Sequence, residues 1–153
     1  MLGLFKRKPV NYFSDEEKQL IVQAIQKAEL RTSGEVRIFI ESHCRFVDPV
    51  MRAHEVFEGL KMSATAERNG VLVYIAMKDK QLAIYGDEGI HSKVGYTFWN
   101  EEVKIMLEHF NKNDYAAGIV EIMHAIGEVL VQHFPYDAKT DKNELSDDIV
   151  FGK

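Results

Sequence analysis

The sequence predicts an α/β fold, a three-layer α/β/α sandwich around a small mixed sheet of about three to four strands, mostly parallel with one hairpin. Three observations predict it. Helix-type and strand-type periodicity alternate through the first half of the chain. The run 71–77 is apolar without a break, which is typical of a central strand covered on both faces. The polar turn 78–80 then returns the chain into a further strand.

The first helix begins at a capping box. Ser14 can accept from the backbone three residues on, while Glu17 reaches back to the start. The apolar residues that follow recur at helical spacing and predict one buried stripe. They are Leu20, Ile21, Ala24, Ile25 and Ala28. Residues 32–34 end this helix.

The next elements predict a parallel strand pair. Val36, Ile38 and Ile40 alternate with polar or mixed residues, a period of two that indicates a strand. Asp48-Pro49 opens a helix because proline suits the first helical position. Its stripe is Val50, Ala53, Phe57 and Leu60. A right-handed crossover through this helix makes strands 36–40 and 71–77 parallel, and residues 81–85 return antiparallel.

The C-terminal half predicts two helices. The first runs from about Tyr96 to Phe110, and the second is capped by Asn113 and ends before Pro135. Gly118 and Gly127 lie inside the second helix and indicate close approach of another element. Residues 149–151 are expected to add a short edge strand or to plug a groove. The predicted organisation is a flexible segment 1–12, the domain 13–135 and an acidic, partly ordered tail 136–153.

Composition excludes several classes of protein. The chain has 153 residues, 46% of them hydrophobic, so one domain with a core is expected. A formal net charge of -5 argues against a nucleic-acid partner. Neither a signal peptide nor an apolar run long enough to insert in a membrane is apparent, so we expect a soluble, cytoplasmic protein and a monomer. The single cysteine, Cys44, cannot form an internal disulfide.

Acidic and amide side chains collect in three predicted loops. Because the first two strands are parallel and the third is antiparallel to its neighbour, loops 33–35, 68–70 and 86–89 should meet at one edge of the sheet. The side chains that this brings together are Glu35, Asn69, Asp87 and Glu88. Carboxylates at flexible spacing suit calcium better than magnesium, because calcium accepts loose geometry. A solvated turn without a ligand explains the same residues equally well.

Other sites find less support. The glycine-rich stretch 86–91 matches no phosphate-loop pattern. Residues 137–148 carry lysines where an EF-hand loop needs oxygen ligands and a glycine. His91 has no partner at zinc-ligand spacing. His43 and Cys44 are adjacent, but a strand would send their side chains to opposite faces, and no serine or cysteine is placed beside a histidine in a way that predicts a catalytic triad.

The order of several short stretches resembles the TPM domain, also called the TPM phosphatase family, over about residues 13 to 134. The stretches are Thr32–Val36, Arg68–Val73, Lys78–Lys80 and Lys112–Gly118. The resemblance implies an α/β/α sandwich. It also implies acid phosphatase activity, as in plastid members, calcium binding, as in some members, or an accessory role in membrane-associated complexes.

Two departures from the family matter. Many members carry a signal peptide and a membrane anchor, which this sequence does not show, so the membrane setting is not carried over. The family turn reads Gly-x-Gly-x-Glu, whereas two residues separate Gly86 from Gly89 here and His91 stands where the acid is expected. Asp87 and Glu88 are the residues that can take over its role.

Three functions follow as hypotheses. The first is a TPM-type module without catalysis that binds calcium at this edge of the sheet and contacts an unknown protein partner. The second is a metal-dependent acid phosphatase acting on phosphate monoesters, with Asp79 or His91 as the proton-transfer group. The third is a purely structural interaction domain. Since Arg37 and Arg68 are the only arginines expected near the site, and phosphoryl transfer needs positive charge, binding is favoured over catalysis.

Overall fold

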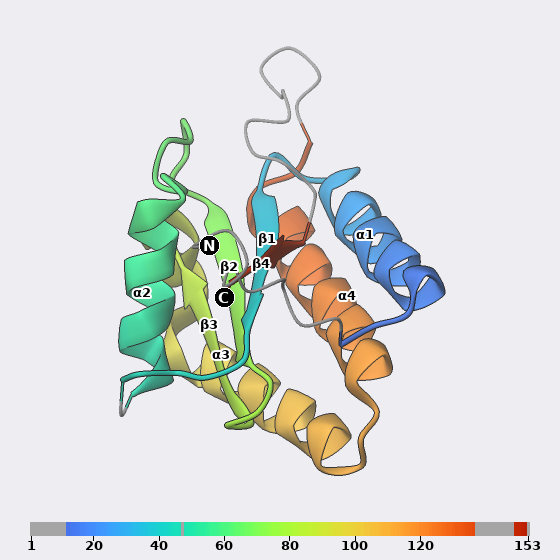
Figure 1. Cartoon of the computed structure of the whole chain (residues 1–153). Helices are drawn as coiled ribbons and strands as arrows, with labels where there is room; N and C mark the ends of the chain where they lie inside the picture. The colour runs from blue at the N-terminus through green and yellow to red at the C-terminus, as the bar shows by residue number, and fades with distance from the viewer. Residues whose placement is uncertain (1–11, 47, 137–148, 153) are drawn as a thin grey trace, which may run out of the picture.

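The computed structural model describes residues 12–46, 48–136 and 149–152. In chain order the elements are α1 (Asp15–Glu29), β1 (Glu35–Glu41), α2 (Pro49–Gly59), β2 (Gly70–Ala76), β3 (Gln81–Gly86), α3 (Glu88–Asn111), α4 (Tyr115–His133) and β4 (Val150–Phe151). Figure 1 shows these elements arranged around one sheet.

The sheet is mixed, as predicted, with the strand order β3-β2-β1-β4. β1 and β2 are parallel, with Glu35 opposite Gly70. β3 returns antiparallel to β2, and Gly86 pairs with Val71. β4 is parallel to β1 on its other side, which confirms the short edge strand expected near the end of the chain.

The two faces of the sheet pack against different helices, which confirms the three-layer fold (Figure 1). The larger core lies between one face and helices α1, α3 and α4, and it includes Val36, Ile38 and Ile40 of β1. The smaller core lies under α2, where Phe57 packs with Tyr74 of β2. Every residue of β2 is buried, as its unbroken apolar run predicts.

The first two helices start where the sequence places them. The reciprocal Ser14–Glu17 capping box is present in α1, and the Asp48 side chain caps α2 by accepting from the Val50 N–H. The predicted stripes are too wide at two positions, because Leu20 is 55% exposed and Val50 is 44% exposed. Both residues lie at the border of their apolar stripe and face outward.

The predicted start of α3 at Tyr96 is wrong, because the helix begins eight residues earlier at Glu88. Asp87 caps it by accepting from the Glu88 N–H. At Gly95 the backbone φ is 75°, which kinks the helix. The kink interrupts the helical periodicity of the sequence, so the residues before it are not recognised as helix.

The start of α4 also differs from the prediction. Its N-cap is Asp114, which makes no side-chain capping bond, and Asn113 instead adopts a left-handed φ of 59°. Asparagine tolerates that conformation, so Asn113 serves the turn between α3 and α4 rather than the cap. The helix ends at His133, before Pro135, as predicted.

The glycines inside α4 allow close approach, as predicted. A Cβ at Gly118 would lie 2.8 Å from the Cβ of His109 on α3, and one at Gly127 would lie 2.9 Å from the Cβ of Ala28 on α1. The predicted N-terminal segment, apart from Tyr12, and residues 137–148 of the tail lie outside the described residues. Among the described helices, none is both long and apolar enough to cross a membrane.

Candidate functional site

The three predicted loops do meet at one edge of the sheet. The Glu35 N–H donates to the Asn69 carbonyl over 3.4 Å, and the Asp87 N–H donates to the Gly70 carbonyl over 2.9 Å. The Gly89 N–H donates to the Arg68 carbonyl over 2.8 Å. Strand pairing alone therefore assembles the backbone of the candidate site, as the topology predicted.

Asp87 is the centre of this edge, and its carboxylate is held by Arg68. Its side chain is 4% exposed. Arg68 donates from Nε to Oδ2 over 2.7 Å and from Nη2 to Oδ1 over 2.9 Å, and Oδ1 also accepts from the Glu88 N–H. Arg68 Nη1 donates to Glu88 Oε1 over 3.2 Å. The guanidinium thus occupies the side of both carboxylates that a cation would approach.

This contact changes the arginine as well. The hydrogen bond to Asp87 is the main cause that raises the pKa of Arg68. A planar guanidinium matches the two oxygens of a carboxylate, which a lysine cannot do. The candidate turn is therefore an ion-pair cluster whose positive charge comes from the chain itself.

The other two predicted ligands, Asn69 and Glu35, are both buried. Asn69 uses its amide nitrogen to donate to Ser33 over 3.2 Å and is 1% exposed. Glu35 is 3% exposed and, by strand alternation, points to the face of the sheet that α2 covers. Across the described ranges, no three His, Cys, Asp or Glu side chains come together in a group suited to a metal ion.

In this arrangement the carboxylates of the predicted calcium site contact Arg68. Calcium takes six to eight oxygen ligands. Here both oxygens of Asp87 already accept hydrogen bonds, and the Glu88 carboxylate accepts from the same guanidinium. Arg68 therefore takes up both oxygens of the buried Asp87 carboxylate, and an ion that binds Asp87 has to compete with it.

The glycines of the stretch 86–91 have structural roles. A Cβ at Gly89 would lie 2.6 Å from the Arg68 carbonyl oxygen and closer still to that of Glu67. One at Gly86 would enter the ring of Trp99. The stretch is therefore the tightly packed start of α3, pressed against the loop before β2, rather than an open turn.

The two predicted proton-transfer residues lie apart. Asp79 is in the β2–β3 turn, at the opposite end of the strands, where it contacts His43 Nδ1 at 2.9 Å and accepts from the Cys44 N–H over 2.7 Å. His91 lies in the first turn of α3, and its Nδ1 accepts from Trp99 Nε1 over 3.1 Å. The structure does not bring Asp79 to the Asp87 turn.

The contacts of Asp79 predict a measurable titration. The hydrogen bond with His43, followed by that from the Cys44 N–H, lowers the pKa of Asp79. A carboxyl with a depressed pKa in the folded state contributes stability above its unfolded pKa, and this is lost as pH falls through the folded pKa. We expect His43→Ala to raise the pKa of Asp79 toward its ordinary value in a carbon-13 NMR titration. The same change at His54, which pairs with Glu58, should leave it unmoved.

Sequence reasoning missed a second polar cluster, at the carboxyl end of β1. Glu41 is 6% exposed and accepts two hydrogen bonds from Arg52 of α2, at 2.8 and 2.9 Å. The hydroxyl of Tyr74 also donates to Glu41, and burial is the main cause that raises the pKa of this phenol. A tyrosine inside an apolar strand needs a partner for its hydroxyl, which is the signal that could have found the cluster.

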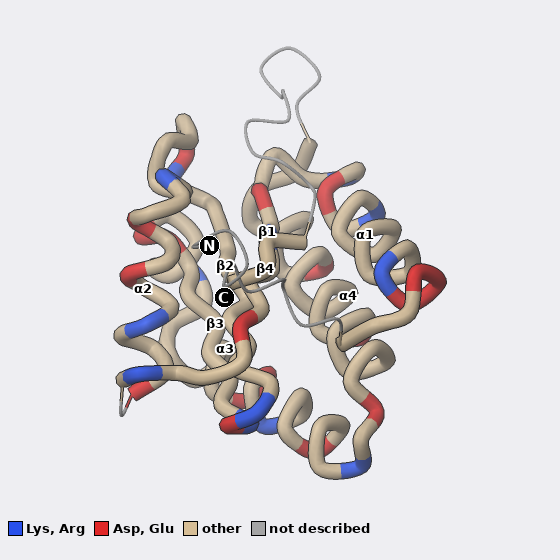
Figure 2. Tube along the Cα trace, in the orientation of Figure 1, with Lys and Arg blue, Asp and Glu red and all other residues tan. Residues whose placement is uncertain are grey.

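This cluster borders a hollow of about 430 Å³ beside the end of β1. Its lining residues are Phe39, Glu41, His43, Arg45, Arg52 and Gly152. The end of a central parallel strand is a common ligand position in α/β sheets. Here the charges are paired, Arg52 with Glu41 and Arg45 with Glu55, and Figure 2 shows the mixed signs along α2. The cluster fixes α2 to the sheet.

Comparison with known proteins gives one family and several similar structures. The family model of the TPM domain matches residues 7–129. The NMR structure of the BA42 protein from Bizionia argentinensis is similar, with a TM-score of 0.85 and 36% identity over 95% of this chain and 99% of that one. No curated protein matches the chain.

Two more distant structures share the fold. The N-terminal domain of the cg2496 protein from Corynebacterium glutamicum has a TM-score of 0.61 at 14% identity, over 77% of this chain and 74% of that one. An N-terminal domain of a protein from P. gingivalis has a TM-score of 0.63 at 14% identity, over 83% of each chain. At such identity the likeness concerns the fold alone.

Proposed function

Because the chain belongs to the TPM-domain family, we propose that it is a non-catalytic binding module, which contacts a protein partner and admits calcium at the Asp87–Glu88 turn only in exchange for Arg68. The observation that carries the proposal is the two-pronged contact of Arg68 with Asp87. In the ion-free protein, the positive charge at this turn is therefore the guanidinium of Arg68.

Burial explains why the exchange needs a replacement cation. The Asp87 side chain is 4% exposed, and a buried carboxylate without a partner is strongly unfavourable. Arg68, whose side chain is 41% exposed, can swing into water once calcium neutralises Asp87 and Glu88. Since the ion must compete with this internal cation, we expect weak binding, with a dissociation constant on the order of 10⁻⁴ to 10⁻³ M.

The exchange gives calcium a way to affect a protein partner. Arg68 and Glu88 are both on the surface, with side chains 41% and 73% exposed. With the ion bound, Glu88 is neutralised and Arg68 becomes available to an acidic group on another protein. The turn then presents a different charge with and without calcium.

The phosphatase alternative needs a proton-transfer group beside the turn. Asp79 lies at the other end of the strands, whereas His91 lies one helical turn from Asp87, and its Nδ1 accepts from Trp99. Phosphate release from a generic monoester, with and without calcium, separates this alternative from binding. The purely structural alternative predicts no calcium response in any variant.

Calcium titration of Arg68→Ala tests the proposal. Without the competing guanidinium, we expect the metal-stripped variant to bind calcium at least about tenfold more tightly than the natural chain, by calorimetry and by amide NMR shifts at residues 86–89. Arg68→Lys should fall between the two, because lysine keeps the charge but not the two-pronged contact. Arg45→Ala, the same change at another paired arginine, should bind as the natural chain does.

Two controls protect the interpretation. Thermal melts establish that each variant is folded, and Asp87→Asn in the Arg68→Ala background should abolish binding. Equal or weaker calcium affinity in folded Arg68→Ala would contradict the exchange.

A further inference from the structure

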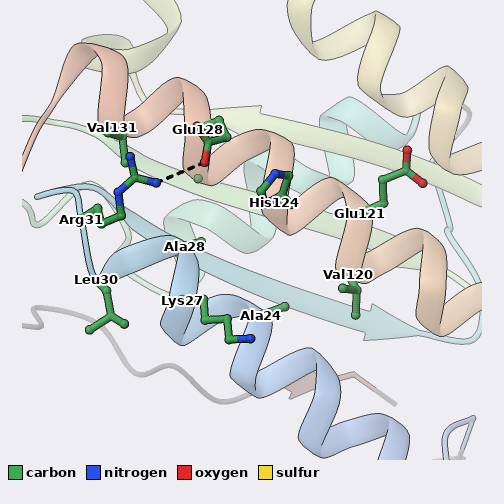
Figure 3. Close-up of a pocket in the computed structure, with 11 residues that line it drawn as sticks. Ala24, Lys27, Ala28, Leu30, Arg31, Val120, Glu121, His124, Glu128 and Val131 are labelled. Carbon is green, nitrogen blue, oxygen red and sulfur yellow. Dashed lines mark hydrogen bonds and ion pairs between the residues drawn. The ribbon is translucent and has the colours of Figure 1, made fainter.

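A groove runs along the outer side of the pair formed by α1 and α4. The ends of the two helices meet, since the Ser33 N–H donates to the Phe134 carbonyl over 3.0 Å. The groove has a volume of about 620 Å³. Figure 3 shows its side chains coming from both helices, with the sheet behind them.

The two walls of the groove repeat at the same helical spacing. One wall is formed by Ala24 and Lys27 of α1 with Arg31 just after the helix, and the other by Val120, His124 and Val131 of α4. Steps of three and four residues keep side chains on one stripe of a helix, and such stripes form the seams where helices pack. Two side-by-side stripes of this kind form a seat for a third helix.

The floor of the groove is formed by small residues. Ala28 and Gly127 let the two backbones approach, because a Cβ at Gly127 would lie 2.9 Å from the Cβ of Ala28. Two large apolar side chains are exposed nearby: Leu30, which lines the groove just after α1, is 70% exposed, and Leu20, one turn before Ala24 on α1, is 55% exposed. The surface is thus apolar at its centre and extends along α1 beyond the groove.

The charges around the groove are unequally satisfied. Arg31 and Glu128 join across it at 3.3 Å, and Glu121 turns to α3, where its carboxylate lies 2.5 Å from His109 Nε2. Within the described residues, Lys27 and His124 make no ion pair. Among the described residues, the charge on the walls that has no ion-pair partner is therefore the positive charge of Lys27.

We propose that this groove binds an amphipathic helix of a protein partner, with an apolar stripe over Ala24, Gly127 and Val120 and with carboxylates beside Lys27 and His124. The ridges of the two walls can receive the side chains of a third helix between them, and the positive charge of Lys27 favours an acidic flank on it. The inference rests on the proposed function, because it names the surface through which the binding module contacts a protein.

The test uses two synthetic helical peptides and the nitrogen-15-labelled full chain. Both peptides carry leucine at alternating steps of three and four residues, one flanked by glutamate and the other by lysine. We expect saturable amide shifts on α1 and α4 with the glutamate peptide, and roughly fivefold weaker binding of the lysine peptide.

A charge reversal makes the test specific. Lys27→Glu should invert the preference between the two peptides, while Lys104→Glu, the same change on the exposed side of α3, should preserve it. Thermal melts of both variants establish that they are folded. No saturable shift with either peptide, equal affinity for both, or shifts outside the groove would overturn the proposal. A concentration-dependent dimer that seals the groove would do so too, since a second copy would then be the occupant.

Failure here is distinguishable from failure of the proposed function. The peptides report on α1 and α4, whereas the calcium titrations report on residues 86–89 at the start of α3. If neither peptide shifts the amides of α1 and α4 while calcium still binds at residues 86–89, the groove is rejected as the partner surface and the proposed function stands.

Discussion

Replacing Glu41 by glutamine is expected to lower the free energy of unfolding by about 3–5 kcal/mol, the cost of breaking a buried ion pair by removing one partner. Glu41 is 6% exposed, and the Arg52 side chain that would lose its carboxylate is 17% exposed. The variant also leaves the Tyr74 hydroxyl with a weaker acceptor. Arg52 joins α2 to β1, so the loss should reduce the attachment of the helix to the sheet.

Chemical denaturation measures this effect, and a second pair of variants separates its causes. Replacing both partners by apolar residues, as in Glu41→Leu with Arg52→Met, should be far less harmful than either change alone, because no buried charge remains. Glu55→Gln is a matched control, since Glu55 contacts the same Arg52 from an exposed position, and a much smaller loss is expected. A loss below about 1 kcal/mol for Glu41→Gln would mean that the cluster is solvated like a surface pair.

Gly89→Ala is expected to destabilise the fold by about 1–3 kcal/mol, the usual cost of overpacking. The added Cβ would lie 2.6 Å from the Arg68 carbonyl oxygen and closer to that of Glu67, and backbone atoms cannot rotate away. The start of α3 would have to move away from the loop before β2. Because Asp87 and Arg68 lie on the two sides of this contact, their ion pair should loosen as well.

Denaturation curves and amide NMR spectra check both parts of this prediction. Gly59→Ala is the matched control, because a Cβ there meets no atom within 4 Å. Alanine also has a higher helix propensity than glycine. That variant should be neutral or slightly more stable. If Gly89→Ala were as stable as Gly59→Ala, with unchanged shifts at Asp87, the result would contradict the close packing of the start of α3 against the loop before β2.

The sheet was predictable because its signals are local and agree with one another. The unbroken apolar run of β2 predicts burial on both faces, and the polar turn after it requires a hairpin. The start of α3 was not predictable in the same way. Its cap, Asp87, lies between two glycines that are individually typical of a loop, and Gly95 interrupts the periodicity a few residues later.

The candidate site was predictable in its backbone and not in its side chains. Strand order alone brings the loops of Asn69 and Asp87 together. Which charges then meet depends on the left-handed φ of 52° at Arg68, which no spacing in the sequence reveals. The arginine expected to stand near a bound ion instead contacts both acids.

The measurement that tests the exchange most directly is the NMR signal of the Arg68 Nε–H group during a calcium titration of the natural chain. In the ion-free protein this group donates to Asp87 over 2.7 Å, so its signal should be shifted and protected from exchange with water. We predict that calcium removes this protection with the same concentration dependence as it moves the amides of residues 86–89. Calcium-dependent shifts at those amides with the Arg68 signal unchanged would contradict the exchange of the guanidinium for the ion.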